Sequence, residues 1–211
     1  MDVVLTEAQV RVIGSLIEKE ITTPEYYPLT INALINACNQ KSNRDPVVAY
    51  NECIVSQVID ELLENGLVLK AGIRDSRVPK YDNYFADTFN LKPQEVAVMC
   101  ELMLRGPQTV GEIRGRADRM YKFAELSEVE VILDGLISRE ERPLVVKLPR
   151  QTGQKEVRYA HLLCGEPLVE VSAELSENLS GACSEIQRII ALEKELEALK
   201  QEFANFKKQF E

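Results

Sequence analysis

The sequence carries one pattern of apolar residues twice, and this repeat limits the folds that the chain can adopt. Within residues 5–20 the apolar positions recur at helical spacing, and the same spacing returns 86 residues later. The paired positions are Val10, Ile13, Leu16 and Ile17 in the first copy and Val96, Met99, Leu102 and Met103 in the second. Thr6 suits the N-cap of the first helix and Pro93 the first turn of the second. We therefore expect two similar units in one chain.

Two further helices repeat in each copy. Thr30 and Thr109, which are 79 residues apart, each suit the cap of a short helix. A third apolar pattern recurs 74 residues on, at Val55, Val58, Ile59, Leu62 and Leu63 and then at Val129, Ile132, Leu133, Leu136 and Ile137. We expect Asp45 and Pro46 to start the third helix of the first copy and Ser127 to cap that of the second.

A β-type run follows each third helix. Residues 67–71 and 144–148 are rich in Leu and Val, and return strands fit residues 80–85 and 157–163 after a turn. Three helices and a hairpin form a winged helix, which is an elaborated helix-turn-helix. The sequence therefore predicts a mainly α fold with small β-hairpins (α+β), with tandem winged-helix domains at residues 1–90 and 91–165.

The chain ends on a heptad pattern of apolar residues. Their spacings alternate between three and four, at Ile189, Leu192, Leu196, Leu199, Phe203, Phe206 and Phe210. We expect a linker at residues 166–184 and a heptad helix at residues 185–211, which forms a coiled coil and a homodimer through residues 186–210. The alternative is a helix that packs on its own chain, since phenylalanine is an unusual coiled-coil residue.

Several segments resemble the bacterial YceH-like family of uncharacterised proteins. They are Thr22–Asn32 (TTPEYYPLTIN), Ala37–Pro46, Arg105–Arg114, Ala117–Tyr121, and the hairpin from Leu148–Arg150 to Arg158–Leu163. The resemblance covers both copies and implies a tandem winged-helix fold without an assigned molecular function. Beyond Gly165 no comparably specific segment occurs, so the coiled coil is predicted from the heptads alone.

The charge and the start of the chain limit the class of protein. Residues 1–7 lack the basic and apolar regions of a signal peptide, and no apolar run approaches the roughly 18 residues of a membrane span, so we expect a cytoplasmic protein that does not contact a membrane. The formal net charge is −9. Because duplex-DNA binders usually carry a basic surface, this charge counts against DNA, although a local basic patch would suffice.

The sequence shows no site for catalysis, for a metal or for an organic cofactor. His161 is the single histidine, and the carboxylates and cysteines have no metal-ligand spacing. Neither of the glycine-rich phosphate-binding motifs occurs. We therefore expect a non-enzymatic protein.

Three groups of basic and polar residues are suited to contact nucleic acid. The turn before the first copy's third helix contributes one group, with Asn51 near the start of that helix: Lys41, Asn43, Arg44 and Asn51. The region around the second copy's second helix contributes Arg114, Arg116, Arg119 and Lys122. The two hairpins contribute Arg74, Arg77, Lys80, Arg150, Lys155 and Arg158.

Each group also has a structural alternative. The turn is equally well explained as a solvated turn with capping side chains, and the arginine cluster as partners of nearby glutamates. The hairpin residues sit where exposed residues are common in any fold. In addition, the third helices carry many acidic residues, such as Asp60, Glu64 and Glu130, which repel phosphates.

Two functions compete on these grounds. The first is a nucleic-acid-binding regulator that contacts duplex DNA, and the second is an acidic winged-helix adaptor that binds a protein partner. The frequency of DNA binding among such folds slightly favours the first. A continuous positive stripe on the surface would support DNA, and basic residues scattered among acidic ones would support the adaptor.

Overall fold

The computed structural model describes residues 4–71, 78–150 and 156–166 of the 211-residue chain. All of them belong to one compact unit, Met1–Pro167, and residues 168–211 form a second unit. The predicted heptad helix, and all of the predicted linker except residue 166, lie outside the described residues.

The described residues form helices joined by two small antiparallel sheets, which confirms the predicted mainly α class. The elements are α1 (Glu7–Thr22), a 3-10 turn (Pro24–Tyr26), β1 (Leu29–Thr30), α2 (Ile31–Cys38), α3 (Glu52–Glu64), β2 (Val68–Ala71), β3 (Lys80–Asn83), α4 (Phe85–Thr88), α5 (Pro93–Arg105), α6 (Val110–Ala117), α7 (Leu126–Ile137), β4 (Val145–Lys147) and β5 (Tyr159–His161).

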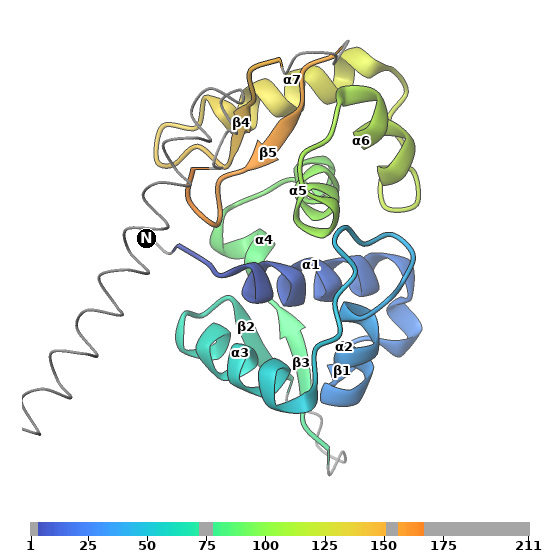
Figure 1. The fold of residues 1–211 in the computed structure, drawn as a ribbon, viewed down its shortest axis with the longest axis vertical. Helices are drawn as coiled ribbons and strands as arrows, with labels where there is room; N and C mark the ends of the chain where they lie inside the picture. Colours follow the sequence, from blue (N-terminus) through green and yellow to red (C-terminus); the bar gives the residue numbers. More distant parts are fainter. Residues whose placement is uncertain (1–3, 72–77, 151–155, 167–211) are drawn as a thin grey trace, which may run out of the picture. The chain divides into compact units, whose positions relative to one another are not determined.

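The order of three helices followed by a hairpin occurs twice (Figure 1). In the first copy β2 and β3 pair with Val68 opposite Asn83, and in the second β4 and β5 pair with Val145 opposite His161. Each hairpin also pairs with the chain just before the second helix. This contact is the short strand β1 on β3 in the first copy, and a single bridge between Gln108 and Tyr159 in the second. The sequence patterns did not predict this third strand.

Polar side chains fix the starts of the helices. Thr6 and Gln9 form a capping box on α1, and Thr109 and Glu112 form the equivalent box on α6. Thr30 caps α2, as predicted, by accepting from the backbone N–H of Ala33.

The third helices start at other residues than expected. α3 begins at Glu52 because Asn51 caps it, with Oδ1 accepting from the backbone N–H of Ile54 at 3.0 Å. Asp45 lies outside the helix, and its backbone N–H donates to Leu104 O at the end of α5. α7 begins at Leu126, so the prediction that Ser127 caps it is wrong.

Helices α1 and α5 lie side by side between the remaining helices of the two copies (Figure 1). Residues 9–18 of α1 and 96–104 of α5 are buried without interruption, and the buried apolar side chains of both copies form one continuous core. The helices approach closely at Gly14, where an added Cβ would lie 3.0 Å from Leu104 Cδ2. Any charged side chain within these buried stretches must therefore find a partner inside the protein.

Candidate functional site

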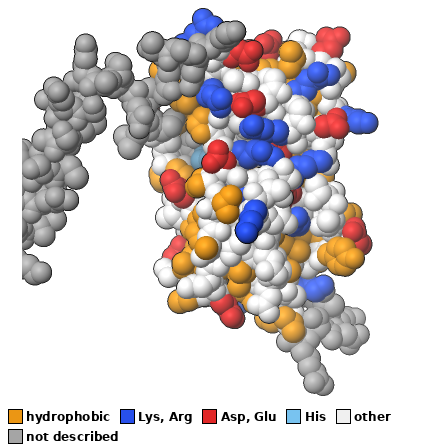
Figure 2. Space-filling view, turned by 45° about the vertical axis from the view of Figure 1, so that its right-hand side comes forward, with side chains coloured by type: hydrophobic (Ala, Val, Ile, Leu, Met, Phe, Trp, Pro, Cys, Tyr) orange, Lys and Arg blue, Asp and Glu red, His pale blue; other side chains and the backbone are white. Residues whose placement is uncertain are grey.

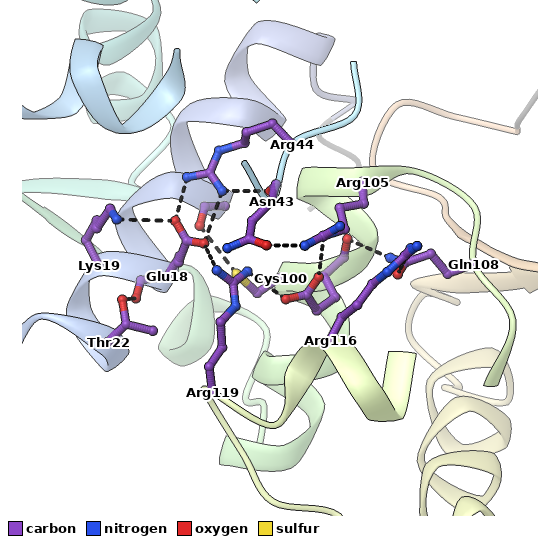
Figure 3. Close-up of polar contacts among 12 residues, drawn as sticks. Glu18, Lys19, Thr22, Asn43, Arg44, Cys100, Arg105, Gln108, Arg116 and Arg119 are labelled. Atoms are coloured by element: carbon purple, nitrogen blue, oxygen red, sulfur yellow. Dashed lines mark hydrogen bonds and ion pairs between the residues drawn. The ribbon is translucent and has the colours of Figure 1, made fainter. Parts of the chain in front are cut away.

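Two glutamates are buried where α1 meets α5. The side chain of Glu18 on α1 is 1% exposed and that of Glu101 on α5 is 0% exposed. Arg119, which follows α6, binds both carboxylates, with Nη1 at 2.5 Å from Glu18 Oε1 and Nη2 at 2.7 Å from Glu101 Oε1. This single guanidinium therefore joins the first helix of the first copy to the first helix of the second (Figure 3).

Two more arginines complete the ion pairs of these carboxylates. Arg44 Nη2 lies 2.5 Å from Glu18 Oε2, and Arg105 Nε lies 3.1 Å from Glu101 Oε2. Arg105 also donates to Asn43 Oδ1, which ties α5 to the turn between α2 and α3. Each buried carboxylate thus has two arginine partners, as a buried charge requires.

The charges of these groups are set by opposing effects. Burial raises the pKa of Glu18, but the hydrogen bond and charge of Arg44, together with the charge of Arg119, outweigh it and hold the pKa below its ordinary value. For Arg119, burial lowers the pKa, but the hydrogen bond that it donates to Glu101 and the charge of Glu18 raise the pKa by more than burial lowers it. Glu18 and Arg119 therefore both stay ionised at neutral pH.

A second group of ion pairs lies beside the first. Glu112 on α6 binds Arg116 at 3.3 Å and Arg158 at 3.0 Å, and these three side chains are 30 to 36% exposed. The buried amide of Gln108 joins the two groups, since Oε1 accepts from Arg116 and Nε2 donates to Glu101 O. Burial raises the pKa of Glu112, but its capping hydrogen bond and the charges of Arg158 and Arg116 lower it below the ordinary value.

The structure corrects the assignment of Arg44 to a nucleic-acid surface. Its side chain is 0% exposed, and besides Glu18 it donates to the carbonyl oxygens of Ala37 and Asn43. A guanidinium enclosed in this way is not available to a phosphate. Asn51 is exposed but serves as the cap of α3, while Lys41 is exposed in the turn itself.

The four basic residues predicted around α6 have different surroundings in the structure. Arg116 and Arg119 are paired with glutamates, which is the structural alternative that the sequence left open. Arg114 donates to the carbonyl oxygens of Phe123 and Ala124 and so holds the turn before α7. Lys122 is exposed.

Of the hairpin residues, Arg158 belongs to the ion pairs described above. Lys80 is half-buried at the start of β3, and Arg150 is exposed. Arg74, Arg77 and Lys155 lie outside the described residues.

The sequence reading missed Glu18, Glu101 and Arg105. A signal was present, because Glu101 is the single charged residue in the apolar run from Val96 to Leu104. A helix that is apolar on all sides is buried on all sides, and a lone charge within it must be paired.

The outer surface of α7 has a different character. On this helix Val131 is 71% exposed and Leu126 is 48% exposed. Next to them is a hollow of about 450 Å³ with a mostly apolar lining, formed by Gln94, Ala124, Glu125, Ser127, Glu128, Val131 and Ile132. The carboxylates of Glu125 and Glu128 give this hollow an acidic rim.

Within the described part of the chain, no group of three or more His, Cys, Asp and Glu residues is placed to hold a metal ion. His161 is half-buried on β5, and the loss of solvent around its imidazole lowers its pKa to about 4. Its imidazole is therefore neutral at physiological pH. The helices that the structure describes include none that is both long enough and apolar enough to cross a membrane.

These features define a mainly α-helical protein of two repeats, which share one apolar core and are joined by Arg119, the partner of buried glutamates on both α1 and α5. The chain belongs to the DUF480 family, a family of proteins of unknown function, whose model matches residues 5–154. The expected membership of an uncharacterised bacterial family is thereby confirmed.

Relatives match the chain over nearly its whole length. It is 51% identical over 197 residues to a UPF0502 protein of Citrifermentans bemidjiense, which covers 93% of this chain and 90% of that protein. It is 50% identical over 212 residues to a UPF0502 protein of Solibacter usitatus, which covers 100% of both chains. It is 46% identical over 204 residues to a UPF0502 protein of Aeromonas hydrophila, which covers 95% of this chain and 93% of that protein.

Proposed function

We propose that this protein is a non-catalytic cytoplasmic adaptor of two winged-helix units that binds a protein partner on the outer surface of α7. The observation that carries the proposal is the exposure of Val131, which lines an apolar hollow, with Leu126 also exposed on the same helix. Exposed apolar side chains around a concave surface are typical of interaction sites. Burial of such side chains by a partner supplies favourable free energy of binding.

The negative charge of this surface favours a partner segment that is positively charged. Glu125 and Glu128 border the hollow, and Glu130 and Asp134 are exposed on the same helix. A complementary segment presents apolar residues at helical spacing with Lys or Arg beside them, because opposite charges steer association and disfavour wrong partners. The proposed partner is therefore a basic amphipathic segment of another protein.

The distribution of charge supports a protein partner over duplex DNA. In a winged helix the third helix enters the major groove, but α3 and α7 both present exposed carboxylates, such as Asp60 and Glu130. Figure 2 shows basic side chains gathered near the middle of one face with acidic side chains directly beside them. Mixed charge of this kind attracts a polyanion less than a continuous positive stripe does.

Nucleic-acid binding is the second candidate function, and one observation favours it. Arg105, Arg116 and Arg119 keep 19 to 36% of their side-chain surface exposed although each is ion-paired. A confined patch of this kind would make few phosphate contacts. A regulator that used it would lose affinity along a shallow salt slope, at roughly −0.9 per neutralised phosphate.

Selection from a random peptide library on the full-length protein tests the adaptor proposal. We expect enrichment of peptides with apolar residues at helical spacing and adjacent Lys or Arg. A synthetic peptide of the enriched sequence should bind Val131→Asp at least about 30-fold more weakly than the wild type, the loss typical of a central interface residue.

The matched control is Val47→Asp, at another exposed valine in the first repeat, which should bind the peptide as the wild type does. Equal losses in both variants, or peptides without basic residues, contradict the proposal. Binding of genomic DNA fragments at about 50 mM salt, with no peptide enriched, would favour the regulator instead.

A further inference from the structure

The ion-pair groups around Glu18 and Glu112 contain more positive than negative charge. Three carboxylates, those of Glu18, Glu101 and Glu112, are matched by Lys19 and five arginines: Arg44, Arg105, Arg116, Arg119 and Arg158. The nearby carboxylates of Asp45 and Asp118 are exposed, where water and salt screen them. The groups therefore carry uncompensated positive charge.

This excess charge faces the solvent. Glu18 and Glu101 are 1% and 0% exposed, whereas the arginines that bind them from outside remain accessible, with Arg105 at 19% and Arg119 at 28%. Arg116 and Arg158 extend the accessible arginines beyond Gln108, at 36% and 35%. The carboxylates hold the arginines in place from within, and the outer edges of the guanidinium groups form a confined positive patch.

The arginines of this patch repel one another. Burial lowers the pKa of Arg105, and the positive charges of Arg116, Arg119 and Arg44 lower it further, against the opposing charge of Glu101. Repulsion of this kind decreases when an anion binds between the groups. The mutual repulsion of these arginines therefore favours the binding of an anion at their solvent-facing edge.

Hydrogen-bond donors remain for such a ligand. Arg105 donates from Nη2 to Asn43, and its Nε lies close to Glu101 Oε2 without a hydrogen bond. Within the described residues, its Nη1 has no protein acceptor. Arg158 donates from Nη1 to Pro107 O and pairs with Glu112 through the same nitrogen. In the part of the chain that the structure describes, its Nη2 has no protein acceptor. Guanidinium donors in a fixed plane match the oxygens of a phosphate group, which accept from two donors at once.

We propose that Arg105, Arg116, Arg119 and Arg158 form a binding site for a phosphate group. The site is separate from the α7 surface of the proposed function and does not depend on it. The phosphate group belongs either to a small phosphorylated molecule or to a nucleic-acid backbone, and the two sources share the chemistry by which these arginines recognise them.

Thermal unfolding of the full-length protein in inorganic phosphate tests the site. Ionic strength is held constant with chloride, so that general screening is equal in all samples. We expect phosphate to raise the melting temperature of the wild type in a saturable way, since a ligand that binds only the folded state stabilises it. The double variant Arg116→Gln/Arg158→Gln should bind phosphate at least about tenfold more weakly.

This double variant leaves Glu18 and Glu101 with their own arginine partners, so it is expected to fold. Lys70→Gln, at an exposed lysine on β2, is the control and should respond to phosphate as the wild type does. Phosphorus NMR line broadening of inorganic phosphate supplies a second readout that does not depend on the stability of a variant.

A third arm separates the two sources. Binding of a 20-base-pair duplex (about two helical turns), with competition by phosphate and loss in the double variant, identifies the nucleic-acid backbone. Binding of phosphate without binding of the duplex identifies a small molecule. The proposal is overturned if phosphate has no effect beyond that of chloride, or if Lys70→Gln and the double variant respond alike.

Discussion

The thiol of Cys100 on α5 donates a hydrogen bond to the carbonyl oxygen of Gly14 on α1, over 3.4 Å. These two residues occupy equivalent positions, since the helical pattern of the first repeat recurs 86 residues later. The repeats therefore meet at matching points of their first helices. A thiol is a weak donor, so this hydrogen bond contributes little stability. It shows how closely the two helices approach each other.

The close approach at Gly14 predicts that a single methyl group there is harmful. In Gly14→Ala the new Cβ would lie 3.0 Å from Leu104 Cδ2 and 3.2 Å from Met103 Cβ. Overpacking of this kind typically costs about 1 to 3 kcal/mol, which outweighs the roughly 1 kcal/mol that alanine gains over glycine in a helix. Urea unfolding should show a lower midpoint for this variant.

Gly135→Ala is the matched control, because an added Cβ at this helical position of α7 meets nothing within 4 Å. It should raise the free energy of unfolding by up to about 1 kcal/mol. If both variants are stabilised, α1 and α5 have room to separate and the tight crossing is wrong.

Glu18 predicts a pH dependence of stability. Its pKa is lower in the folded protein than its ordinary value of 4.5, so the unfolded chain takes up this proton first as the pH falls. The contribution of Glu18 is therefore complete above the ordinary value and is lost as the pH falls through the lower, folded pKa. Free energies of unfolding measured from pH 7 to pH 3 should decline over this window.

Glu18→Gln should remove this part of the acid dependence and should also cost about 3 to 5 kcal/mol at pH 7, because Arg44 stays buried without its charged partner. Glu64→Gln, at an exposed position near the end of α3, should leave both properties unchanged. A Glu18→Gln variant as stable as the wild type at pH 7 would show that the ion pair is not needed for stability.

The cysteines should differ in reactivity with iodoacetamide. Burial raises the pKa of Cys38 to about 11, and Cys100 is also buried, whereas Cys53 is exposed on α3. Because the thiolate is the reactive form, peptide mass spectrometry should find Cys53 alkylated before Cys38 and Cys100. Alkylation of Cys38 and Cys100 should follow only after unfolding by denaturant, and equal rates in the native protein would contradict the buried positions.

The dimer predicted from the heptad segment stays a prediction, because this segment lies outside the described residues. The seam from Ile189 to Phe210 has the spacing of a helix-pairing surface. Removal of the residues after Gly181 should convert a dimer into a monomer, and light scattering of both forms is the measurement. If both are monomeric, the seam packs on its own chain instead.

The sequence revealed the parts of this fold that depend on local physics. Caps such as Thr30 and Thr109 act within one helical turn, and the apolar periodicity of each helix can be read within its own residues. The predicted start of α3 was wrong because Asn51 and Asp45 are both residue types that cap helices well. In the structure Asn51 caps α3, whereas Asp45 contacts Leu104 in the other repeat.

The candidate site was harder to predict because it depends on contacts between distant parts of the chain. Arg44 lies 26 residues from Glu18, and Arg119 reaches Glu18 from the other repeat. Both arginines occur in polar stretches typical of a surface. Their burial becomes visible only when the carboxylate that binds them is known, and the sequence does not specify which of its many carboxylates that is.

The contact between Gly14 and Cys100 has a further consequence. Equivalent residues of the two copies touch each other here, as they do at the centre of an isologous dimer. Here both halves are encoded in one chain, so their association is intramolecular and does not depend on protein concentration. Each half is also free to change without the other. Arg119 of the second half pairs with Glu18 of the first, a contact that two identical subunits in a symmetric dimer would have to make twice.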